Sequence, residues 1–164
     1  MGKKTKQYKP MIISDGMPGA GLAALRVAKA LNLPTYGIAP PGFQYPDGPK
    51  PELAELYHLE ELNTRNVKDK KQLQTMRIKE NLNQCSVALI IEDHWEQMAS
   101  YATYAEEYVP VFKTQCKHLY ARNFISFLED KPPYITIIGT HNPKIEDDMY
   151  NTLFEALKFM KNNN

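Results

Sequence analysis

The sequence predicts an α/β fold, a Rossmann-like three-layer sandwich with a mainly parallel β-sheet. Short β-branched apolar runs alternate with longer segments of helical periodicity, as in chains that wind helices around a parallel sheet. The run at 86–91 is apolar without polar alternation, which is typical of a strand covered on both faces. The first apolar run leads through a glycine-rich turn directly into an alanine- and leucine-rich helix.

The expected elements follow in order along the chain. Strands are expected at 11–14, 35–39, 86–91, 109–112 and 134–138. Helices are expected at 20–31, 70–83, 96–108, 117–128 and 146–160. The first of these helices places Leu22, Leu25, Ala28 and Leu31 on one face, and the last begins with three acidic residues that suit its positive end. Between them, the stretch 40–51 holds five prolines and two glycines, so we expect a long loop there that binds something or is disordered.

Length and composition favour one domain at 10–161, preceded by a flexible basic tail at 1–9. The net charge of +1 gives no reason to expect a nucleic-acid partner, and no apolar run is long enough to cross a membrane. Two distant cysteines, Cys85 and Cys116, do not suggest a disulfide framework. We therefore expect a cytoplasmic protein, and we expect neither a bound metal nor a resident cofactor.

The turn after the first strand, Asp15 to Gly21, favours an anion site. Glycines let the backbone approach a ligand, and the first N–H groups of a helix have no partners within it. Together with the helix dipole they can hold a phosphate. The alternative is a tight strand-to-helix turn without a ligand.

Ligands of open parallel sheets bind beyond the carboxyl ends of the strands. Four loops are expected at that edge, namely 15–21, 40–48, 92–100 and 139–144. The first, second and fourth are rich in glycine, proline or small polar residues, as a ligand-facing loop would be. The sequence thus predicts a small-molecule site formed by loops that are distant along the chain.

Four segments, taken in order, carry a resemblance to a known family. Its opening S-G-G-Q-T-G-x-D-x-A-A-L is matched at Ser14, Gly16, Gly19, Ala23, Ala24 and Leu25. Its G-x-x-P-x-G and following D-G are matched at Gly37, Pro40, Gly42, Asp47 and Gly48. Its R-T-x-x-N before a strand is matched at Arg77 and Asn81, and its last strand, small-polar loop and early helical tyrosine at 137–144 and Tyr150. The chain resembles the circularly permuted branch of the SLOG superfamily, a Rossmann-like clan that includes the Lonely Guy phosphoribohydrolases and molybdenum-cofactor carriers.

The chain also departs from the family pattern. The family's aspartate in the first loop is Gly21 here, and its glutamine–threonine pair is Met17-Pro18. A second loop, G-G-T followed by a glutamate, is missing; the nearest segment is 98–101, with Glu106 as the match for the acid. In relatives that loop is implied to hold phosphate or ribose during glycosidic-bond hydrolysis. Its loss argues against efficient hydrolysis but not against binding.

These observations predict a protein that binds a nucleotide-derived or phosphate-bearing small molecule without turnover, in the manner of a sponge for a nucleotide second messenger. Arg77 would clamp the phosphate or, alternatively, lie on a solvated helix face; Asp47 would accept ribose hydroxyls or only start a turn. The expected ligand contacts are Ser14, Asp15, Gly16, Met17, Pro18, Gly19, Ala20, Gly21, Pro40, Gly42, Asp47, Gly48, Arg77, Asn81, His94, Trp95, Thr140 and His141.

Two other functions remain open at this point. One is a phosphoribohydrolase or nucleosidase, for which Glu106 would be the acid–base residue. The other is a molybdenum-cofactor carrier, as implied by the resemblance. The resemblance implies a homodimer or a higher homo-oligomer, because relatives in the clan form homodimers or tetramers. The tyrosines at 101, 104 and 108 would share one helical stripe, which suits the core, such an interface or stacking on a base.

Overall fold

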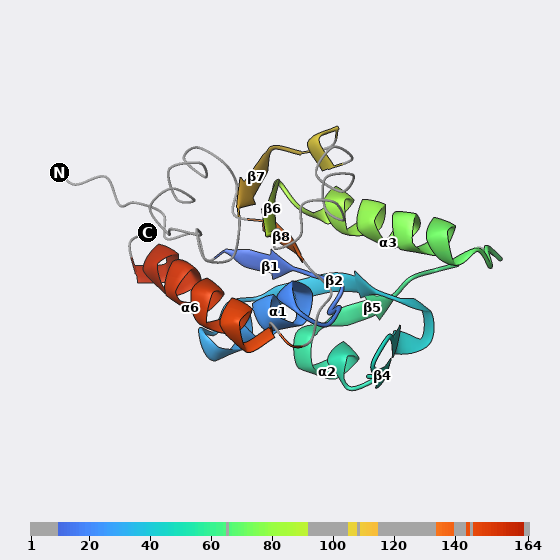
Figure 1. Cartoon of the computed structure of the whole chain (residues 1–164), viewed down its shortest axis with the longest axis horizontal. Helices are drawn as coiled ribbons and strands as arrows, with labels where there is room; N and C mark the ends of the chain where they lie inside the picture. The colour runs from blue at the N-terminus through green and yellow to red at the C-terminus, as the bar shows by residue number, and fades with distance from the viewer. Residues whose placement is uncertain are drawn as a thin grey trace.

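The fold is a six-stranded, all-parallel β-sheet with helices on both faces (Figure 1). The computed structural model describes residues 10–64, 66–91, 105–107, 109–114, 134–139, 144 and 146–162, with side chains as far as Lys158. The sheet order is β5-β2-β1-β8-β6-β7. The strands are β1 Met11–Ile13, β2 Thr35–Ala39, β5 Leu59–Glu61, β6 Val87–Ile91, β7 Val111–Thr114 and β8 Tyr134–Gly139. The predicted α/β sandwich is therefore confirmed.

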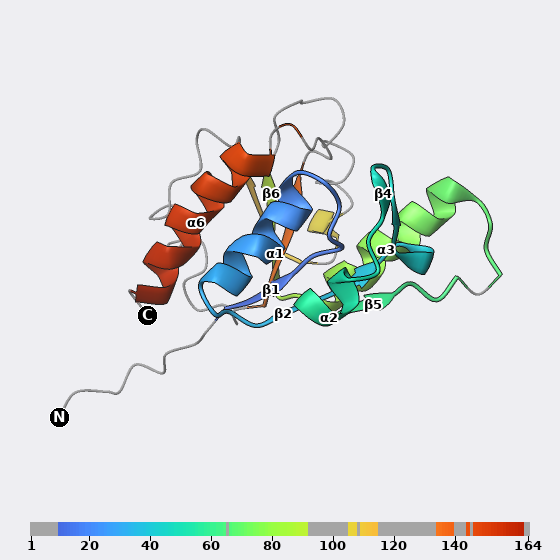
Figure 2. The ribbon, with the colours of Figure 1, turned by 90° about the horizontal axis from the view of Figure 1, so that it is seen from below.

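Among the described elements, two long helices cover one face of the sheet and one long helix covers the other. Helices α1 (Ala20–Ala30) and α6 (Glu146–Asn162) pack side by side on the first face, and α3 (Lys70–Gln84) lies on the second (Figure 2). Strand β6 shows why this arrangement needs an unbroken apolar run. Val87, Leu89 and Ile91 pack into the α1/α6 layer, whereas Ala88 and Ile90 pack against α3, and all five residues are buried.

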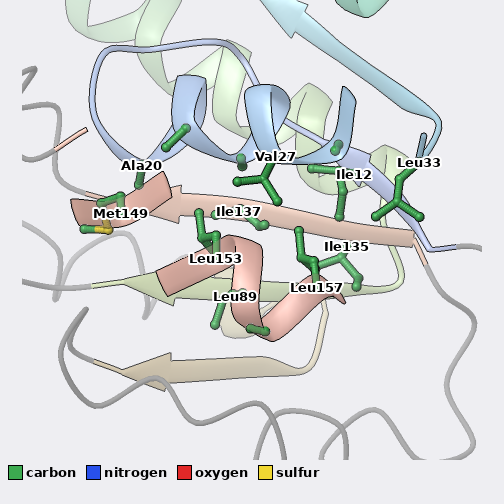
Figure 3. Close-up of a cluster of buried hydrophobic side chains, with 14 of the residues drawn as sticks. Ile12, Ala20, Val27, Leu33, Leu89, Ile135, Ile137, Met149, Leu153 and Leu157 are labelled. Atoms are coloured by element: carbon green, nitrogen blue, oxygen red, sulfur yellow. The ribbon is translucent and has the colours of Figure 1, made fainter. Parts of the chain in front are cut away.

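The main core lies between the sheet and the α1/α6 layer (Figure 3). Alternate strand residues such as Ile12, Leu89 and Ile135 meet Val27 of α1 and Leu153 of α6 there, and none of them is exposed. Small residues along α1 let the helix lie close to the sheet, because four of the eleven are alanines at buried positions: Ala20, Ala23, Ala24 and Ala28. This core fixes where α1 begins relative to the ends of β1 and β8.

The stretch 40–51 is more ordered than the sequence predicts. It contains a short 3-10 turn η1 (Pro41–Phe43) and an antiparallel hairpin of β3 (Gln44–Tyr45) and β4 (Gly48–Pro49). The expectation of a long irregular loop was wrong because the chain reverses at Pro46-Asp47 and closes a hairpin in which Tyr45 pairs with Gly48. Its prolines are compatible with a two-stranded ribbon that is not part of the main sheet.

Two further elements were not expected from the sequence. They are the helix α2 (Leu53–Tyr57) and the edge strand β5, of five and three residues, which are too short to show a periodic pattern. Together with the hairpin they form a second apolar cluster against α1, built from Met17, Leu25, Ala39, Tyr45, Leu53, Tyr57 and Leu59. Met17 belongs to the loop after β1, so this cluster fixes that loop from the side.

The other bounds agree with the sequence to within two residues; β7 begins and ends two residues later than the predicted 109–112. The expected helix at 117–128, the helix at 96–108 apart from its end at 105–107, and the basic tail lie outside the described residues. Within the part of the chain that the structure describes, no helix is both long and apolar enough to cross a bilayer.

Candidate functional site

The candidate site lies at the carboxyl edge of the sheet, where the loop after β1 meets the end of β8 and the hairpin after β2. Strand β1 lies between β2 and β8, so the chain segments that leave these three strands are neighbours. The loop that precedes α1 and the β3–β4 hairpin lie at the same end of the molecule (Figure 2). This is the edge at which ligands of open parallel sheets bind.

The loop between β1 and α1 is held by its own polar side chains. The Ser14 hydroxyl donates to the carbonyl oxygen of Gly21 at 2.9 Å and accepts the Gly16 N–H at 3.1 Å. The Asp15 Oδ1 accepts the Met17 N–H at 3.0 Å. Gly19 precedes the helix with φ 92° and ψ −128°, a conformation that only glycine adopts without strain. These contacts fix the conformation of the loop, which places the N-terminus of α1 at the carboxyl edge of the sheet.

The first turn of α1 is not capped by a side chain. Among the described residues, no acceptor meets the backbone N–H of Ala20 or of Gly21, and both residues are buried. Buried N–H groups are almost always paired in native proteins, so these two donors need an acceptor. An anion at the helix N-terminus would supply one.

The end of β8 holds the start of α1 in place. A Cβ at Gly139 would lie 2.3 Å from the Cβ of Ala20 and 3.1 Å from the carbonyl oxygen of Ile91. Only a glycine at this position lets the helix come so close to the strand end. The helix N-terminus is thus positioned by two strands, β8 and β6.

Arg77 of α3 reaches this loop from the other face of the sheet. Its Nε donates to the Asp15 Oδ2 at 3.0 Å, and the two side chains are 8% and 16% exposed. Nε is the only guanidinium nitrogen of Arg77 with an acceptor in the described part of the chain. The predicted clamp is therefore next to the predicted loop, and it is already paired with a carboxylate of that loop.

Asn81, one turn after Arg77, closes a gap between two strands. Its Oδ1 accepts the Ile38 N–H at 2.8 Å, and its Nδ2 donates to the carbonyl oxygens of Ile38 and Arg77 at 3.1 and 3.0 Å. Strand β1 pairs with β2 only as far as Tyr36, so the side chain of Asn81 replaces a strand partner for Ile38. All its hydrogen-bonding groups are engaged in the protein, which suits a residue that shapes the site.

Tyr45 is a site residue that the sequence analysis missed. Its hydroxyl donates to the carbonyl oxygen of Asp15 at 2.7 Å and so ties the hairpin to the loop. Burial raises the pKa of Tyr45 above its usual range, and the Asp15 carboxylate adds to that shift. The signal in the sequence is its position immediately before the Pro46-Asp47 turn of a hairpin.

The other predicted contacts of the second loop lie on or beside the hairpin. Pro40 is buried, and the Gly42 N–H donates to the Glu61 carboxylate at 2.8 Å. Asp47 pairs with Lys50 at 2.8 Å within the turn that includes Gly48. No hydrogen bond between the side chain of Asp47 and the loop after β1 is present among the described residues.

Glu106 lies near the outer strand β7, away from the loop after β1. It is half exposed and pairs with Lys113 of β7 at 3.3 Å. Three strand spacings of about 4.8 Å, on the order of 14 Å in all, separate β1 from β7, the strand whose Lys113 Glu106 contacts. His94, Trp95, Thr140 and His141 lie outside the described residues. No cluster of three or more metal-ligating side chains occurs in the part that the structure describes.

A small cavity lies beneath the loop, between β1, β8 and α3. It has a volume of about 20 Å³ and is lined by Ser14, Asp15, Met17, Gly21, Ile78, Asn81 and residues 136–139. Such a volume holds about one water molecule. A nucleotide-sized ligand would therefore lie over the loop edge, and only a single small group could enter this cavity.

The comparisons with known proteins support the fold. No protein-family model and no curated protein matches the chain. Among solved structures, the chain is similar to the crystal structure of a putative molybdenum carrier protein from Syntrophus aciditrophicus SB, with a TM-score of 0.70 and 22% sequence identity. The match covers 92% of this chain and 95% of the other. The resemblance inferred from the motifs is thus confirmed at the level of the fold.

Proposed function

We propose that this protein binds a nucleotide-derived small molecule through its phosphate, at the loop between β1 and α1, and holds it without turnover. The phosphate would contact the N–H groups at the start of α1 and the guanidinium of Arg77. The hairpin with Pro40, Gly42, Asp47 and Gly48 would close over the remainder of the ligand, and His94, Trp95, Thr140 and His141 are proposed to line the same edge.

The observation that carries this proposal is that Arg77 and the uncapped start of α1 both lie beside the same residue, Asp15. An arginine that is 93% buried is costly unless its charge and its N–H groups are satisfied. Only its Nε has an acceptor among the described residues, and the N–H groups of Ala20 and Gly21 at the start of α1 have none there. A phosphate offers oxygen acceptors to both sets of donors and matches the planar guanidinium.

Two observations favour holding the ligand over cleaving it. The family's glycine-rich catalytic loop is missing from the sequence, and Glu106, the candidate acid, pairs with Lys113 at the outer strand β7. A site that retains its phosphate contacts, and to which the described structure does not bring Glu106, suits sequestration, as expected of a sponge for a nucleotide second messenger.

A ligand-recovery assay tests the proposal. The protein is incubated with linear and cyclic nucleotides and ADP-ribose derivatives, freed of unbound material and heat-denatured, and the released compounds are identified by mass spectrometry. We expect one class to be recovered intact from the wild type and to be lost with Arg77→Gln. Lys79→Gln is the matched control, because it removes the same charge from an exposed position on the same helix.

Two outcomes would contradict the proposal. Recovery of free base together with ribose phosphate would show an enzyme. Recovery of no compound, or equal recovery from Arg77→Gln and the wild type, would exclude the proposed loop as a phosphate site. Melting temperatures of both variants, measured without ligand, separate loss of binding from loss of folding.

A second candidate, a carrier for the molybdenum cofactor, is favoured by the fold match to a putative molybdenum carrier protein. The cofactor is a pterin that ends in a phosphate, so it would use the same anion contacts. Protein purified from cells grown with molybdate would then release a fluorescent pterin on denaturation. Metal analysis that finds no molybdenum, with no pterin fluorescence, would exclude this candidate.

A further inference from the structure

We infer that Asp15 acts as an internal anion that limits how strongly this site binds phosphate. The inference rests on the proposed function, since it concerns the affinity and selectivity of the same loop. It is carried by the position of one carboxylate, which lies where the ligand's charge would lie.

The Asp15 carboxylate occupies two donors that a phosphate would need. Oδ1 accepts the Met17 N–H at 3.0 Å, and Oδ2 accepts the Arg77 Nε at 3.0 Å. Both side chains of the ion pair are largely buried, so their attraction is screened less by water than that of a surface pair. A ligand anion must either displace this carboxylate or bind beside it and be repelled.

The carboxylate also lies over the first turn of α1. A Cβ placed on Gly21 would lie 3.1 Å from the Asp15 Oδ1 and 3.0 Å from the Ser14 hydroxyl. Position 21 is where the family pattern has its aspartate and this chain has none. Asp15 therefore brings a carboxylate to the space beside residue 21 from the opposite side of the loop, where it interacts favourably with the positive end of the helix.

The arrangement neutralises the one buried arginine of the site. With Asp15 ionised, the Asp15–Arg77 pair has no net charge, and the donors that remain are the Nη groups of Arg77 and the N–H groups of Ala20 and Gly21. Such a site binds an isolated phosphate weakly. It requires its ligand to gain affinity from other groups, which selects a larger nucleotide-derived molecule over free inorganic phosphates.

Asp15→Asn tests this inference, with inorganic pyrophosphate as the probe and calorimetry or equilibrium dialysis as the measurement. The amide oxygen can still accept the Met17 N–H, so the loop keeps that bond, while Arg77 loses its counter-charge. We expect pyrophosphate to bind about tenfold more tightly to Asp15→Asn than to the wild type, the scale of one nearby charge. A merely structural role predicts the opposite sign, because a damaged loop binds less.

Two further variants make the result specific. Asp148→Asn removes the same charge from an exposed position on α6 and should leave the affinity unchanged. In the double variant Asp15→Asn/Arg77→Gln the gain should vanish, because the released guanidinium is its source. The melting temperature of Asp15→Asn should fall without pyrophosphate and rise more than that of the wild type when it is added.

The outcomes separate this inference from the proposed function. If wild type and Asp15→Asn bind pyrophosphate equally, or the variant binds less, Asp15 is not an internal competitor, and nucleotide recovery by the wild type still decides the proposed function. If Asp15→Asn binds pyrophosphate and the wild type does not, the carboxylate of Asp15 excludes a simple phosphate from this loop, and the inference is confirmed. If neither binds, the inference is overturned, and a wild type that also recovers no nucleotide overturns the proposed function.

Discussion

Tyr45 shows how one side chain connects two parts of the site. Its ring is buried in the cluster under the hairpin, and its hydroxyl reaches the backbone of the loop after β1. The phenol must keep its proton to donate this bond, and the raised pKa of Tyr45 favours the protonated form. The position of the hairpin over the loop therefore depends on a group whose charge state can be tested.

Raising the pH should loosen this contact in a defined window. Unfolded tyrosine loses its proton near pH 10, whereas the folded pKa of Tyr45 is higher, so its contribution to stability is intact below pH 10 and falls as the pH rises above it. In urea unfolding between pH 8 and pH 11.5, Tyr45→Phe should lower the free energy of unfolding by about 1 kcal/mol at pH 8. Above pH 10 the free energy of unfolding of Tyr45→Phe should decline less steeply with pH than that of the wild type, by up to about 1.4 kcal/mol per pH unit. Parallel curves would refute the assignment.

Asp15 and Arg77 mark the limit of prediction at this scale. The motifs located both residues, and the structure brings them together across 62 positions of the sequence. No local pattern indicates that they pair, because the contact depends on where α3 crosses the sheet. The sequence could therefore indicate Arg77 as a candidate for anion binding, but it could not predict the ion pair of Arg77 with Asp15.

At the scale of elements, α3 and β2 are joined by the carboxamide of Asn81. The pairing of β1 with β2 ends at Tyr36, where β1 gives way to the loop that precedes α1, so Ile38 has no partner on β1. Asn81 satisfies both backbone groups of Ile38 that would otherwise be left without partners. The R-T-x-x-N motif thus supplies a residue that supports the site as well as one that faces it.

Replacing Asn81 by alanine should destabilise the fold by about 2 to 4 kcal/mol, since the buried N–H and C=O of Ile38 would lose their partners. Chemical denaturation gives the free energy directly. Asn83→Ala is the matched control, because Asn83 is exposed on the same helix and its loss should cost less than about 0.5 kcal/mol. Equal effects of the two substitutions would argue against the role given to Asn81.

The elements divide into those that a periodic pattern reveals and those that tertiary contacts create. Strand β2 has the predicted bounds, and α1, α3 and β6 differ from them by one residue, because long amphipathic or fully apolar segments carry their own signal. Helix α2 and strand β5 are stable only where they pack on α1 and β2, so no window of sequence could identify them.

At the scale of the whole molecule, the two faces of the sheet are covered by different means. The α1/α6 side is a continuous apolar layer, whereas the described part of the α3 side includes buried polar groups such as Asn81 and Thr136. The stability of the molecule should therefore be most sensitive to cavities on the first side.

Leu89→Ala should lower the free energy of unfolding by about 2 to 5 kcal/mol, because the side chain is fully buried between the sheet and the helix layer. The change should appear as a lower denaturation midpoint with an unchanged slope. Leu56→Ala removes the same atoms from a residue that is 43% exposed and should change stability by less than about 1 kcal/mol. A small effect of Leu89→Ala would show that this core is not the main source of stability.

The order of strands in the sheet has a consequence for how the chain is made. Strand β8 lies between β1 and β6, although it follows all five other strands in the sequence. A ribosome releases the chain from its N-terminus, so the middle of the sheet stays unfilled until residues 134–139 emerge. The two halves, β5-β2-β1 and β6-β7, cannot join before then, and the start of α1 lacks the Gly139 surface on which it packs. The loop between β1 and α1 can thus take its final shape only after translation has passed the last strand.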